Sequence, residues 1–371
     1  MPEFDVVVVG GGPAGALAAR AAAQAGAKTL LLERAPRREA RCAGLVSLAT
    51  AERLAVPPDL VLREICGLRV FGPDGPVLAL RAAHPKAVVL DRTSLDRWLL
   101  TQAQEQGVHL AAAPAKAVAP GVLHGPPAPV KFAVLVGADG AVSLVGRSLG
   151  LPRPQEILIG LQAVVEAELG DEVHVFLGVI PDFFAWAVPA EEGRARVGLA
   201  TREGRAAQAG LRALLKTWFP TARVRQVQAG LIPLGPPPRT AQGDALLVGN
   251  AAGQVKPLTG GGLAFIARCA PLAGELAAQG RAGLHRYEQA WRGLIGEELA
   301  FQLAARKAFL RLGPVRAVQL FKALPQKLGE FLAQEGEIDS LSSLPRKVRN
   351  RPDLWPALLA LWRWLPRELL G

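Results

Sequence analysis

The first forty residues alternate apolar runs with short polar or glycine-rich breaks. An apolar run over residues 5–9 is followed by three glycines, an alanine-rich stretch over 16–25 and a second apolar run over 28–32. Short uninterrupted apolar runs are typical of strands buried on both faces, and the alanine-rich stretch is long enough for a helix. The pattern predicts a strand, a turn, a helix and a strand in succession at the N-terminus.

Three glycines at the end of the first run have the spacing G-x-G-x-x-G. Gly10 permits a tight turn, Gly12 lets the backbone approach a pyrophosphate, and Gly15 lets the helix pack closely on the strand. Glu33 ends the second run, where a carboxylate suits a ribose hydroxyl and repels a 2′-phosphate. The turn is therefore predicted to bind FAD or NAD rather than NADP. The predicted cofactor site also includes the adjoining residues Pro13, Ala14 and Arg34.

Two later segments continue the pattern of buried strands. The apolar run 88–90 leads to Arg92 and a helix with one apolar face, and a strand over 132–137 ends in an acidic turn at Asp139. Both charged residues are candidate cofactor contacts. The alternatives are that Arg92 pairs with Asp96 and that Asp139 only caps the helix after its turn.

Other parts of the chain alternate apolar and polar positions, which is typical of antiparallel sheets. A hairpin is predicted over 67–81. Further strands are expected over 157–166, 173–177, 185–188 and 196–200. We interpret them as a separate antiparallel sheet on which a substrate lies.

A second glycine-rich turn follows a strand expected over 245–248. A helix is predicted over 263–279, directly after three glycines. Such a helix start offers unpaired N–H groups to an anionic or electron-rich group. For Lys256, between the two glycine runs, an approach to the cofactor and a solvated position both stay open. Beyond residue 300 the chain is predicted to be helical, with breaks at Pro314, Pro325, Pro345, Pro352, Pro356 and Pro366.

Composition narrows the class of protein. The chain of 371 residues is long enough for two domains and an appendage. No apolar stretch reaches the roughly 18 residues of a membrane span, and the N-terminus lacks the features of a signal peptide. A cytoplasmic protein is therefore expected. The three cysteines are far apart and the five histidines do not cluster, so neither a disulfide framework nor a metal site is expected.

Positive charge is concentrated near the C-terminus. The net charge is +11, and residues 301–371 hold twelve Lys/Arg against six Asp/Glu. A basic surface can meet nucleic acid, anionic lipid or an acidic protein, or can simply be solvated. The absence of a basic stripe interleaved with aromatic residues argues against nucleic acid. Residues 354–365 mix Trp, Leu and Arg as interfacial helices do, which predicts contact with a membrane surface. The alternative is a helix packed on the rest of the protein, with its Trp residues as core.

Four motifs over about residues 1–300 resemble the FAD-dependent geranylgeranyl reductase family, within the flavoprotein class that includes the aromatic-ring hydroxylases. Three are shared by the class, namely the fingerprint with Glu33, the segment 136–140 and the segment 249–262. The fourth is Pro181-Asp182-Phe183-Phe184-Ala185-Trp186-Ala187-Val188-Pro189. It is similar to the P-x-x-Y-x-W-x-F-P signature of the reductases, with Phe184 for Tyr and Val188 for Phe.

The resemblance implies roles for individual residues. Those implied to line FAD are Ala14, Glu33, Cys42, Ala43, Arg92, Asn250, Gly262 and Leu263. Those implied to face the substrate beside the isoalloxazine ring are Phe184, Trp186 and Pro189. The N–H groups of Gly261 and Gly262 are expected to stabilise negative charge on the reduced flavin, and the apolar walls to align a chain for hydride transfer.

This chain departs from the family pattern at three places. Asn250 replaces the usual Asp, so FAD is held without charge assistance and binding is expected to be weaker. Phe184 lacks the Tyr hydroxyl, which favours a purely apolar substrate. Cys42-Ala43-Gly44 stands where the reductases carry Cys-Gly, and Cys42 is either a catalytic candidate beside the flavin or a buried inert thiol. For Trp186, a core position is the alternative to lining the pocket.

The expected fold is α/β, with a Rossmann-like FAD-binding domain, an inserted antiparallel-sheet substrate domain and a helical C-terminal region. The FAD-binding domain is expected to be discontinuous, over 1–66, 86–150 and 240–300. The substrate domain is assigned to 67–85 and 151–239, and the helical region to 301–371.

The expected function is reduction of C=C bonds in a polyprenyl chain or isoprenoid lipid. The alternative is a flavin-dependent monooxygenase or halogenase acting on an aromatic substrate, because the first three motifs are shared with those enzymes. The chain shows no second G-x-G-x-x-G for a dedicated nicotinamide domain. The reductant is therefore expected to be NAD(P)H that docks transiently or a reduced ferredoxin. A cytoplasmic enzyme, peripheral to the membrane through its basic C-terminal region, fits these expectations.

Overall fold

The computed structural model describes residues 1–125 and 128–357, and it divides into two compact units. The first unit comprises Met1–Ala40, Arg92–Ile157 and Ile232–Leu299. The second comprises Arg41–Asp91, Leu158–Leu231 and the chain from Ala300 onward.

Five parallel strands form the centre of the first unit, in the order β18-β11-β1-β2-β8. In β1, Val6, Val7 and Val8 are fully buried, as expected of a strand covered on both faces. This confirms the strands expected at the N-terminus. The strands of this sheet are β1 Glu3–Val9, β2 Thr29–Leu32, β8 His109–Ala111, β9 Ala117–Ala119, β10 Val122–His124, β11 Val130–Gly137, β17 Ala241–Gln242 and β18 Ala245–Leu247.

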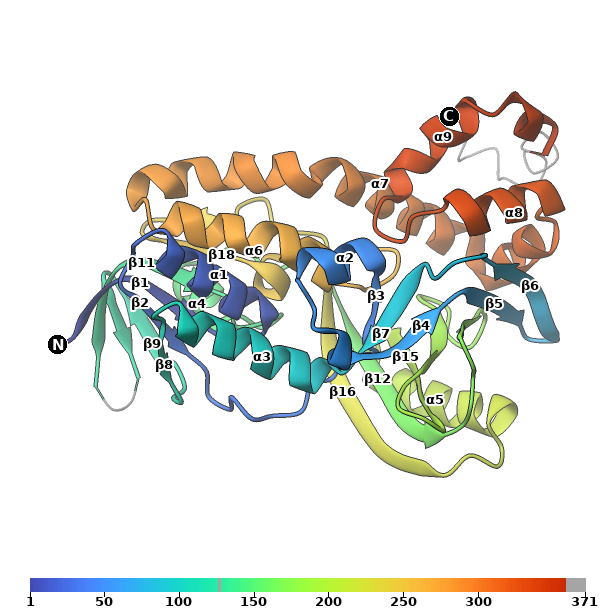
Figure 1. Ribbon diagram of the computed structural model, residues 1–371, viewed down its shortest axis with the longest axis horizontal. Helices are drawn as coiled ribbons and strands as arrows, with labels where there is room; N and C mark the ends of the chain where they lie inside the picture. The colour runs from blue at the N-terminus through green and yellow to red at the C-terminus, as the bar shows by residue number, and fades with distance from the viewer. Residues whose placement is uncertain (126–127, 358–371) are drawn as a thin grey trace. The chain divides into compact units, whose positions relative to one another are not determined.

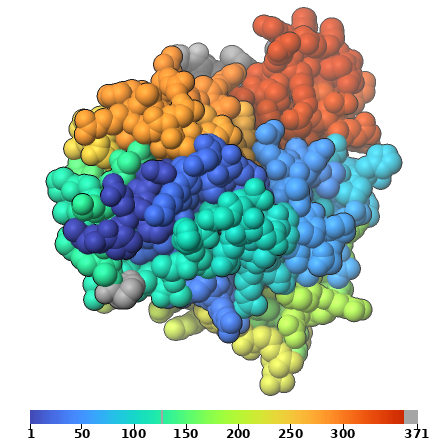
Figure 2. All heavy atoms as spheres, turned by 60° about the vertical axis from the view of Figure 1, so that its left-hand side comes forward, coloured from blue at the N-terminus to red at the C-terminus, as the bar shows by residue number. Residues whose placement is uncertain are grey.

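Small residues let the helices of this unit pack closely. Helix α1 (Pro13–Gln24) lies between α3 (Arg92–Glu105) and α6 (Leu263–Ala277), as Figure 1 shows. A Cβ on Gly274 of α6 would lie 2.0 Å from the carbonyl oxygen of Ala18 in α1, so only glycine allows this approach. Figure 2 shows α1 in dark blue and α3 in teal side by side on the surface. The other helices of the unit are α4 Leu144–Ser148, the short η2 Gly249–Ala252 and the first part of α7 Arg281–Lys322.

The second unit contains a seven-stranded sheet in the order β16-β12-β15-β14-β13-β5-β6. The predicted hairpin is confirmed as β5 and β6, and β12 to β15 confirm the four strands expected after residue 150. The sheet is not antiparallel throughout, because β13 pairs in parallel with β5. The hairpin comes from an earlier part of the chain, so no short turn forces an antiparallel pairing on it. The strands are β5 Gly67–Gly72, β6 Gly75–Arg81, β12 Glu156–Glu166, β13 Glu172–Phe176, β14 Ala185–Pro189, β15 Arg194–Thr201 and β16 Val224–Leu234.

Smaller elements complete this unit. Strands β3 (Leu45–Ser47), β7 (Ala87–Leu90) and β4 (Val61–Ile65) form a separate sheet. The helices and helical turns are α2 Leu48–Arg53, η1 Pro58–Leu60, α5 Gly204–Trp218, α8 Gln326–Glu335, η3 Leu341–Ser343, α9 Leu344–Arg349 and η4 Pro352–Leu354.

Four of the predicted prolines, Pro314, Pro325, Pro345 and Pro352, lie at a helix break or in the first turn of a helix. Pro356 lies within a helical stretch and does not break it, and Pro366 lies outside the described residues. Helix α7 breaks at Gly313, which has φ +71° and ψ 165° and precedes Pro314. Helix α8 begins directly after Pro325, and Pro345 occupies the first turn of α9. In the described part of the chain, no helix combines the length and the apolar character needed to cross a membrane. Most of the segment 354–365, predicted to be interfacial, lies outside the described residues.

Candidate functional site

In the glycine turn between β1 and α1, neighbouring atoms leave no room for a side chain at Gly10 or Gly15, whereas Gly12 faces open space. A Cβ on Gly10, which has φ +102°, would lie 2.5 Å from the carbonyl oxygen of Ala138, and one on Gly15 would lie 1.7 Å from that of Gly10. A Cβ on Gly12 would meet nothing within 4 Å. The protein therefore leaves space at Gly12, where a pyrophosphate would approach the backbone.

The N-terminus of α1 is suited to bind an anion. Gly12 occupies the N-cap position and Pro13 the first turn, and no side chain within the described residues caps this helix. The first turn also lacks acidic residues. The N–H groups of Ala14 and Gly15 and the positive end of the helix dipole thus face the glycine turn, which fits the diphosphate of a dinucleotide.

Glu33 is held in place by the backbone of the same turn. Its Oε2 accepts from the N–H of Gly11 at 2.7 Å, and its Oε1 accepts from the N–H of Ala35 at 2.8 Å. Each carboxylate oxygen can accept a further hydrogen bond, such as one from a ribose hydroxyl. A Cβ on Gly11 would lie 2.7 Å from the Cβ of Glu33. Gly11 is thus part of the site, although it falls between the fingerprint positions. Arg34, next in the chain, is exposed.

Asp139 has a complete structural role in the turn after β11. Its Oδ2 accepts from the N–H groups of Leu144 at 2.7 Å and Val145 at 3.1 Å, and its Oδ1 accepts from the hydroxyl of Ser143 at 2.6 Å. It therefore caps α4, which was the alternative drawn from the sequence. A contact between Asp139 and the cofactor stays a prediction.

Arg92 begins α3 and is buried. One of its terminal nitrogens lies 2.8 Å from Oδ1 of Asp96, one helical turn further on. The alternative pairing is thus present, and contact between Arg92 and the cofactor stays a prediction.

The second glycine-rich turn brings Asn250 next to the start of α6. The Oδ1 of Asn250 lies 3.3 Å from the position that a Cβ on Gly262 would take. Gly262 is the N-cap residue of α6, and no described side chain caps this helix, which starts at Leu263. The amide oxygen and the open N–H groups of the helix start together offer an acceptor and donors to one ligand.

Lys256 closes the loop that leads into α6. Its N–H donates to the carbonyl of Gly261 at 3.0 Å, and its carbonyl accepts from the N–H of Gly260 at 2.8 Å. The residue is only 5% exposed, so the solvated position is wrong. The turn that carries Gly261 is therefore fixed by its own main chain.

A buried hydrogen-bond network supports the turn at Asn250. The sequence analysis did not predict it. The hydroxyl of Tyr287 donates to the carbonyl of Leu247 at 2.7 Å and accepts from the amide of Gln254 at 3.4 Å. The Oε1 of Gln254 accepts from the N–H of Gly249 at 2.8 Å. Burial raises the pKa of Tyr287 well above its ordinary value, so its hydroxyl stays protonated and able to donate. Tyr287 is the only tyrosine of the chain. This was the one sequence feature that could have drawn attention to it.

In the second unit, each residue of the loop Cys42-Ala43-Gly44 takes part in a hydrogen bond. The N–H of Gly44 donates to Sγ of Cys42 at 3.4 Å, and its carbonyl accepts from the N–H of Leu90 at 3.0 Å. The carbonyl of Ala43 accepts from the guanidinium of Arg196 at 3.0 Å. Arg196 is buried in β15 and also lies 3.5 Å from Glu191. This positioning arginine was not recognised from the sequence, because it lies 153 residues from the loop.

Trp186 lies over a glycine on the neighbouring strand. It pairs with Gly198 across β14 and β15, and a Cβ on Gly198 would lie 2.8 Å from Cζ2 of the indole. The ring of Phe184 meets that of Trp186 edge-on, with centroids 6.3 Å apart. The Nε1 of Trp186 is buried and has no hydrogen-bond partner within the described chain. The pair therefore presents two aromatic rings, and the indole N–H remains an unsatisfied donor in the described part of the chain.

The structure brings some predicted residues of this unit together and separates others. Ala43 and Trp186 pack against the same apolar cluster, which includes Val188. Phe184 packs against a different cluster. Both aromatic residues are half-buried, whereas Pro189 is buried. Of the predicted cofactor residues, Cys42 and Ala43 belong to the second unit and the others to the first.

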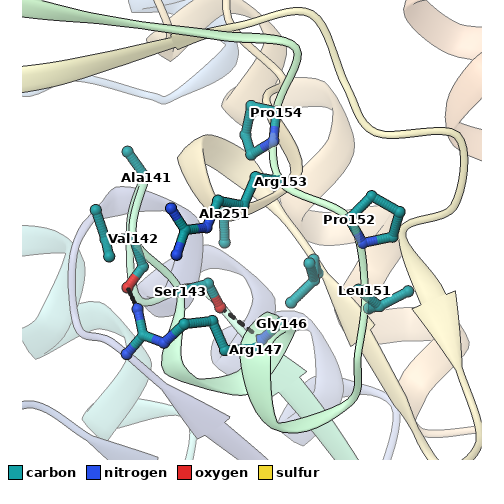
Figure 3. A pocket seen from close by; sticks show the side chains of 11 residues that line it. Ala141, Val142, Ser143, Gly146, Arg147, Leu151, Pro152, Arg153, Pro154 and Ala251 are labelled. Atoms are coloured by element: carbon teal, nitrogen blue, oxygen red, sulfur yellow. Dashed lines mark hydrogen bonds between the residues drawn. The ribbon is translucent and has the colours of Figure 1, made fainter.

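A small pocket in the first unit lies beside α4 (Figure 3). Arg147 turns towards the carbonyl of Val142, to which it donates at 3.0 Å, and the hydroxyl of Ser143 accepts from the N–H of Gly146 at 2.8 Å. Because these groups are engaged with one another and no predicted site residue lines the pocket, we assign it no ligand.

The chain is similar to known proteins over most of its length. Residues 5–37 match the family model described as FAD dependent oxidoreductase. The chain is 32% identical to digeranylgeranylglycerophospholipid reductase 2 of Methanothermobacter thermautotrophicus, over 95% of this chain and all of that protein. It is 33% identical to digeranylgeranylglycerophospholipid reductase 2 of Methanopyrus kandleri, over 88% of this chain and 91% of the relative.

Solved structures share the fold. A geranylgeranyl bacteriochlorophyll reductase-like protein from Thermoplasma acidophilum matches with a TM-score of 0.83 at 21% identity, over 97% of this chain and all of that one. A flavin-dependent brominase matches with a TM-score of 0.67 at 18% identity, over 97% of this chain and 93% of its own. At these identities the likeness concerns the fold alone.

Proposed function

The chain belongs to the geranylgeranyl reductase family of FAD-dependent oxidoreductases, and from this premise we propose that it saturates the isoprenoid chains of a digeranylgeranylglycerol phospholipid or a similar polyprenyl lipid. The observation that carries the proposal is the identity of 32% to a reductase named for that lipid, over the whole of the relative. The half-buried apolar pair Phe184 and Trp186 supports it, because such a wall suits a hydrocarbon chain.

The first unit has the groups needed to hold FAD. The N–H groups at the start of α1 would bind the diphosphate, Glu33 a ribose hydroxyl, and Asn250 with the start of α6 the flavin end. When bound and reduced, FAD supplies a hydride to one carbon of a C=C bond, and the other carbon takes a proton from water or from an acid. The N–H groups of Gly261 and Gly262 would stabilise negative charge near them, because they are fixed in place before the reaction.

The second unit would align the lipid chain. Phe184 and Trp186 would hold the chain by apolar contact and exclude water from it, and Arg196 fixes the loop at Ala43 through its carbonyl. These contacts position the chain, and none of them supplies the proton that completes the reduction.

The test is an anaerobic experiment on the purified holoenzyme. After the flavin is reduced with dithionite, a digeranylgeranylglycerol phospholipid is added without oxygen. We expect the flavin absorbance to return and the lipid to gain two hydrogen atoms for each bond reduced, as seen by mass spectrometry. Return of the absorbance only when air is admitted would instead favour the monooxygenase or halogenase alternative.

Replacing Trp186 tests the substrate wall. W186A should abolish turnover, with FAD still bound, because the chain loses the surface that aligns it. W218F is a matched control, since Trp218 packs against Phe71 and Phe176 elsewhere in the same unit. Unaltered turnover in W186A would refute the assignment of this wall.

We further propose that the electron donor docks transiently, as NAD(P)H or as a reduced ferredoxin. The proposal is supported by the single dinucleotide fingerprint of the chain. Anaerobic mixing of the holoenzyme with each donor in turn, followed by the flavin absorbance, identifies the donor that reduces the enzyme. Failure of both would contradict the proposal.

We also propose peripheral contact with an anionic membrane through the basic C-terminal region. Arg346 and Arg349 are exposed on α9, and Trp355 is 50% exposed just after η4. Exposed arginines next to an exposed tryptophan suit the interface between lipid headgroups and acyl chains. A membrane-embedded lipid substrate would make such contact useful.

A further inference from the structure

Arg306 is a buried cation in the second unit, and it lies beyond the four motifs that carry the resemblance to the reductases. It belongs to α7 and is only 3% exposed. One terminal nitrogen donates to the carbonyl of Asp182 at 3.2 Å, and the guanidinium carbon lies 5.3 Å from the centroid of the Phe183 ring. Both partners belong to the segment Pro181–Pro189 that carries the family signature.

A buried guanidinium must be held by fixed partners. Burial of a charge is costly unless hydrogen bonds and favourable electrostatics compensate for it. A carbonyl oxygen and the negative face of an aromatic ring both provide such compensation, and the planar guanidinium can satisfy both at once. Its orientation therefore fixes where the main chain of Asp182 and the ring of Phe183 lie.

The same segment is held from its other side by β15. The Oδ2 of Asp182 accepts from the hydroxyl of Thr201 at 3.1 Å and from the N–H of Arg202 at 2.7 Å. The main chain of Asp182 is thus held through Arg306 and its side chain through the end of β15. This leaves little freedom at the start of the signature segment.

The fixed ring is the first of three aromatic residues in contact. Phe183 stacks on Phe184 with centroids 4.4 Å apart and planes inclined by 19°. Phe184 in turn meets Trp186 edge-on at 71°. Because stacked and edge-on rings lock one another, a shift of Phe183 would displace the wall formed by the other two.

We propose that Arg306 is a positioning residue for this wall and thereby sets the alignment of the apolar substrate chain. The inference rests on the proposed function, in which Phe184 and Trp186 contact the lipid. It assigns a part of the substrate site to the C-terminal region.

The first test compares turnover in three variants of the holoenzyme. In R306M, which keeps the length of the side chain but loses its charge and planarity, kcat should fall about ten- to a hundredfold while KM changes less. R306K should recover part of this loss, because its ammonium group can still donate to the Asp182 carbonyl. R311M is the control, since Arg311 is exposed on the same helix. The flavin absorbance spectrum should be the same in all three.

A kcat for R306M equal to that of the wild type, measured per folded and FAD-loaded protein, would overturn the proposal. So would a loss in R306M that R306K does not recover in part, because a merely structural role predicts no such rescue.

A double-mutant cycle tests the contact without substrate. R306M and F183L, alone and combined, are unfolded in urea. If the guanidinium holds the Phe183 ring, the shifts in unfolding midpoint should not add. Additive shifts would overturn the role of Arg306, whereas a wild-type enzyme that reduces no lipid would overturn the proposed function instead.

Discussion

At the scale of single residues, the fingerprint glycines differ in what requires them. Gly10 and Gly15 are required by neighbouring backbone atoms, and Gly11 by the side chain of Glu33. Only Gly12 faces open space. The spacing of the glycines predicts the motif but does not distinguish these causes, because it contains no information on which atoms lie across the turn.

A pair of alanine variants separates the two causes. G12A should leave the thermal stability of the apoprotein unchanged and weaken FAD binding about ten- to a hundredfold, because a methyl group would displace the phosphate from the N–H groups. G15A should lower the stability of the apoprotein by about 1–3 kcal/mol through overpacking. Thermal melts with and without FAD, and a titration with FAD, provide the comparison. A destabilised G12A apoprotein would contradict this assignment of the open space.

The thiol of Cys269 is predicted to be inert. Burial raises its pKa to about 12 from an ordinary value of 9.0, so it holds its proton at neutral pH. Iodoacetamide at pH 8 should therefore leave Cys269 unmodified in the native protein and modify it after unfolding, as mass spectrometry of the peptides will show. Rapid labelling of the native protein at this residue would contradict its buried position.

The same thiol predicts a stability change at high pH. Above about pH 9 the unfolded chain loses this proton while the native state keeps it, so the native state binds more protons and the free energy of unfolding falls as pH rises. In C269A this fall between about pH 9 and 12 should be shallower. Urea unfolding at several pH values measures the difference, and identical slopes would count against it.

At the scale of elements, local patterns predict more than long-range contacts do. The buried runs and alternating segments correctly predict β1, β2, β5 to β7, β11 to β15 and β18, and Pro314, Pro325 and Pro345 mark breaks between C-terminal helices. The short strands β3, β4, β8 to β10 and β17 and the long strand β16 were missed. The sequence did not predict the parallel pairing of β13 with β5. It also did not predict the hydrogen bonds from Tyr287 to Leu247 and from Arg196 to Ala43. Each depends on which distant elements meet, and hydrophobic periodicity does not specify that.

Removal of the hydrogen bond between Tyr287 and Leu247 should lower the stability measurably. Y287F removes the donor to the carbonyl of Leu247, which lies in a buried site, so the free energy of unfolding should fall by about 1–3 kcal/mol. H285A, at an exposed position on the same helix, should change it by less than about 0.5 kcal/mol. Urea unfolding of both variants makes the comparison. Equal effects would mean that the hydroxyl does not stabilise this turn.

At the scale of the whole molecule, positive charge is concentrated in the C-terminal region, as the composition of the chain already indicated. The exposed arginines of α9 belong to a segment whose apolar side is buried, because Val348 and Leu354 pack with Leu328 and Phe331. Deletion of this segment would therefore also remove core residues. Surface substitutions are the better test of membrane contact.

The variant R346E/R349E/W355S should lose binding to vesicles of anionic phospholipid, since about 1 kcal/mol of attraction is lost for each basic residue near the surface. R205E/R212E changes the charge equally on exposed positions of α5 and should still bind. Sedimentation of vesicles with bound protein measures both. If the first variant sediments as well as the wild type, the C-terminal region is not the contact.

Gly198 has a consequence for how this enzyme can change. A Cβ at this position would lie 2.6 Å from the Cβ of Gln162, 2.8 Å from the carbonyl oxygen of Leu161 and 2.8 Å from the Trp186 indole, so both the indole and the neighbouring strand β12 would have to shift. The position of the indole therefore depends on a residue that has no side chain with which to contact a lipid. Evolution, or a mutant library, could reshape the wall through position 198 while every residue of the signature stays the same.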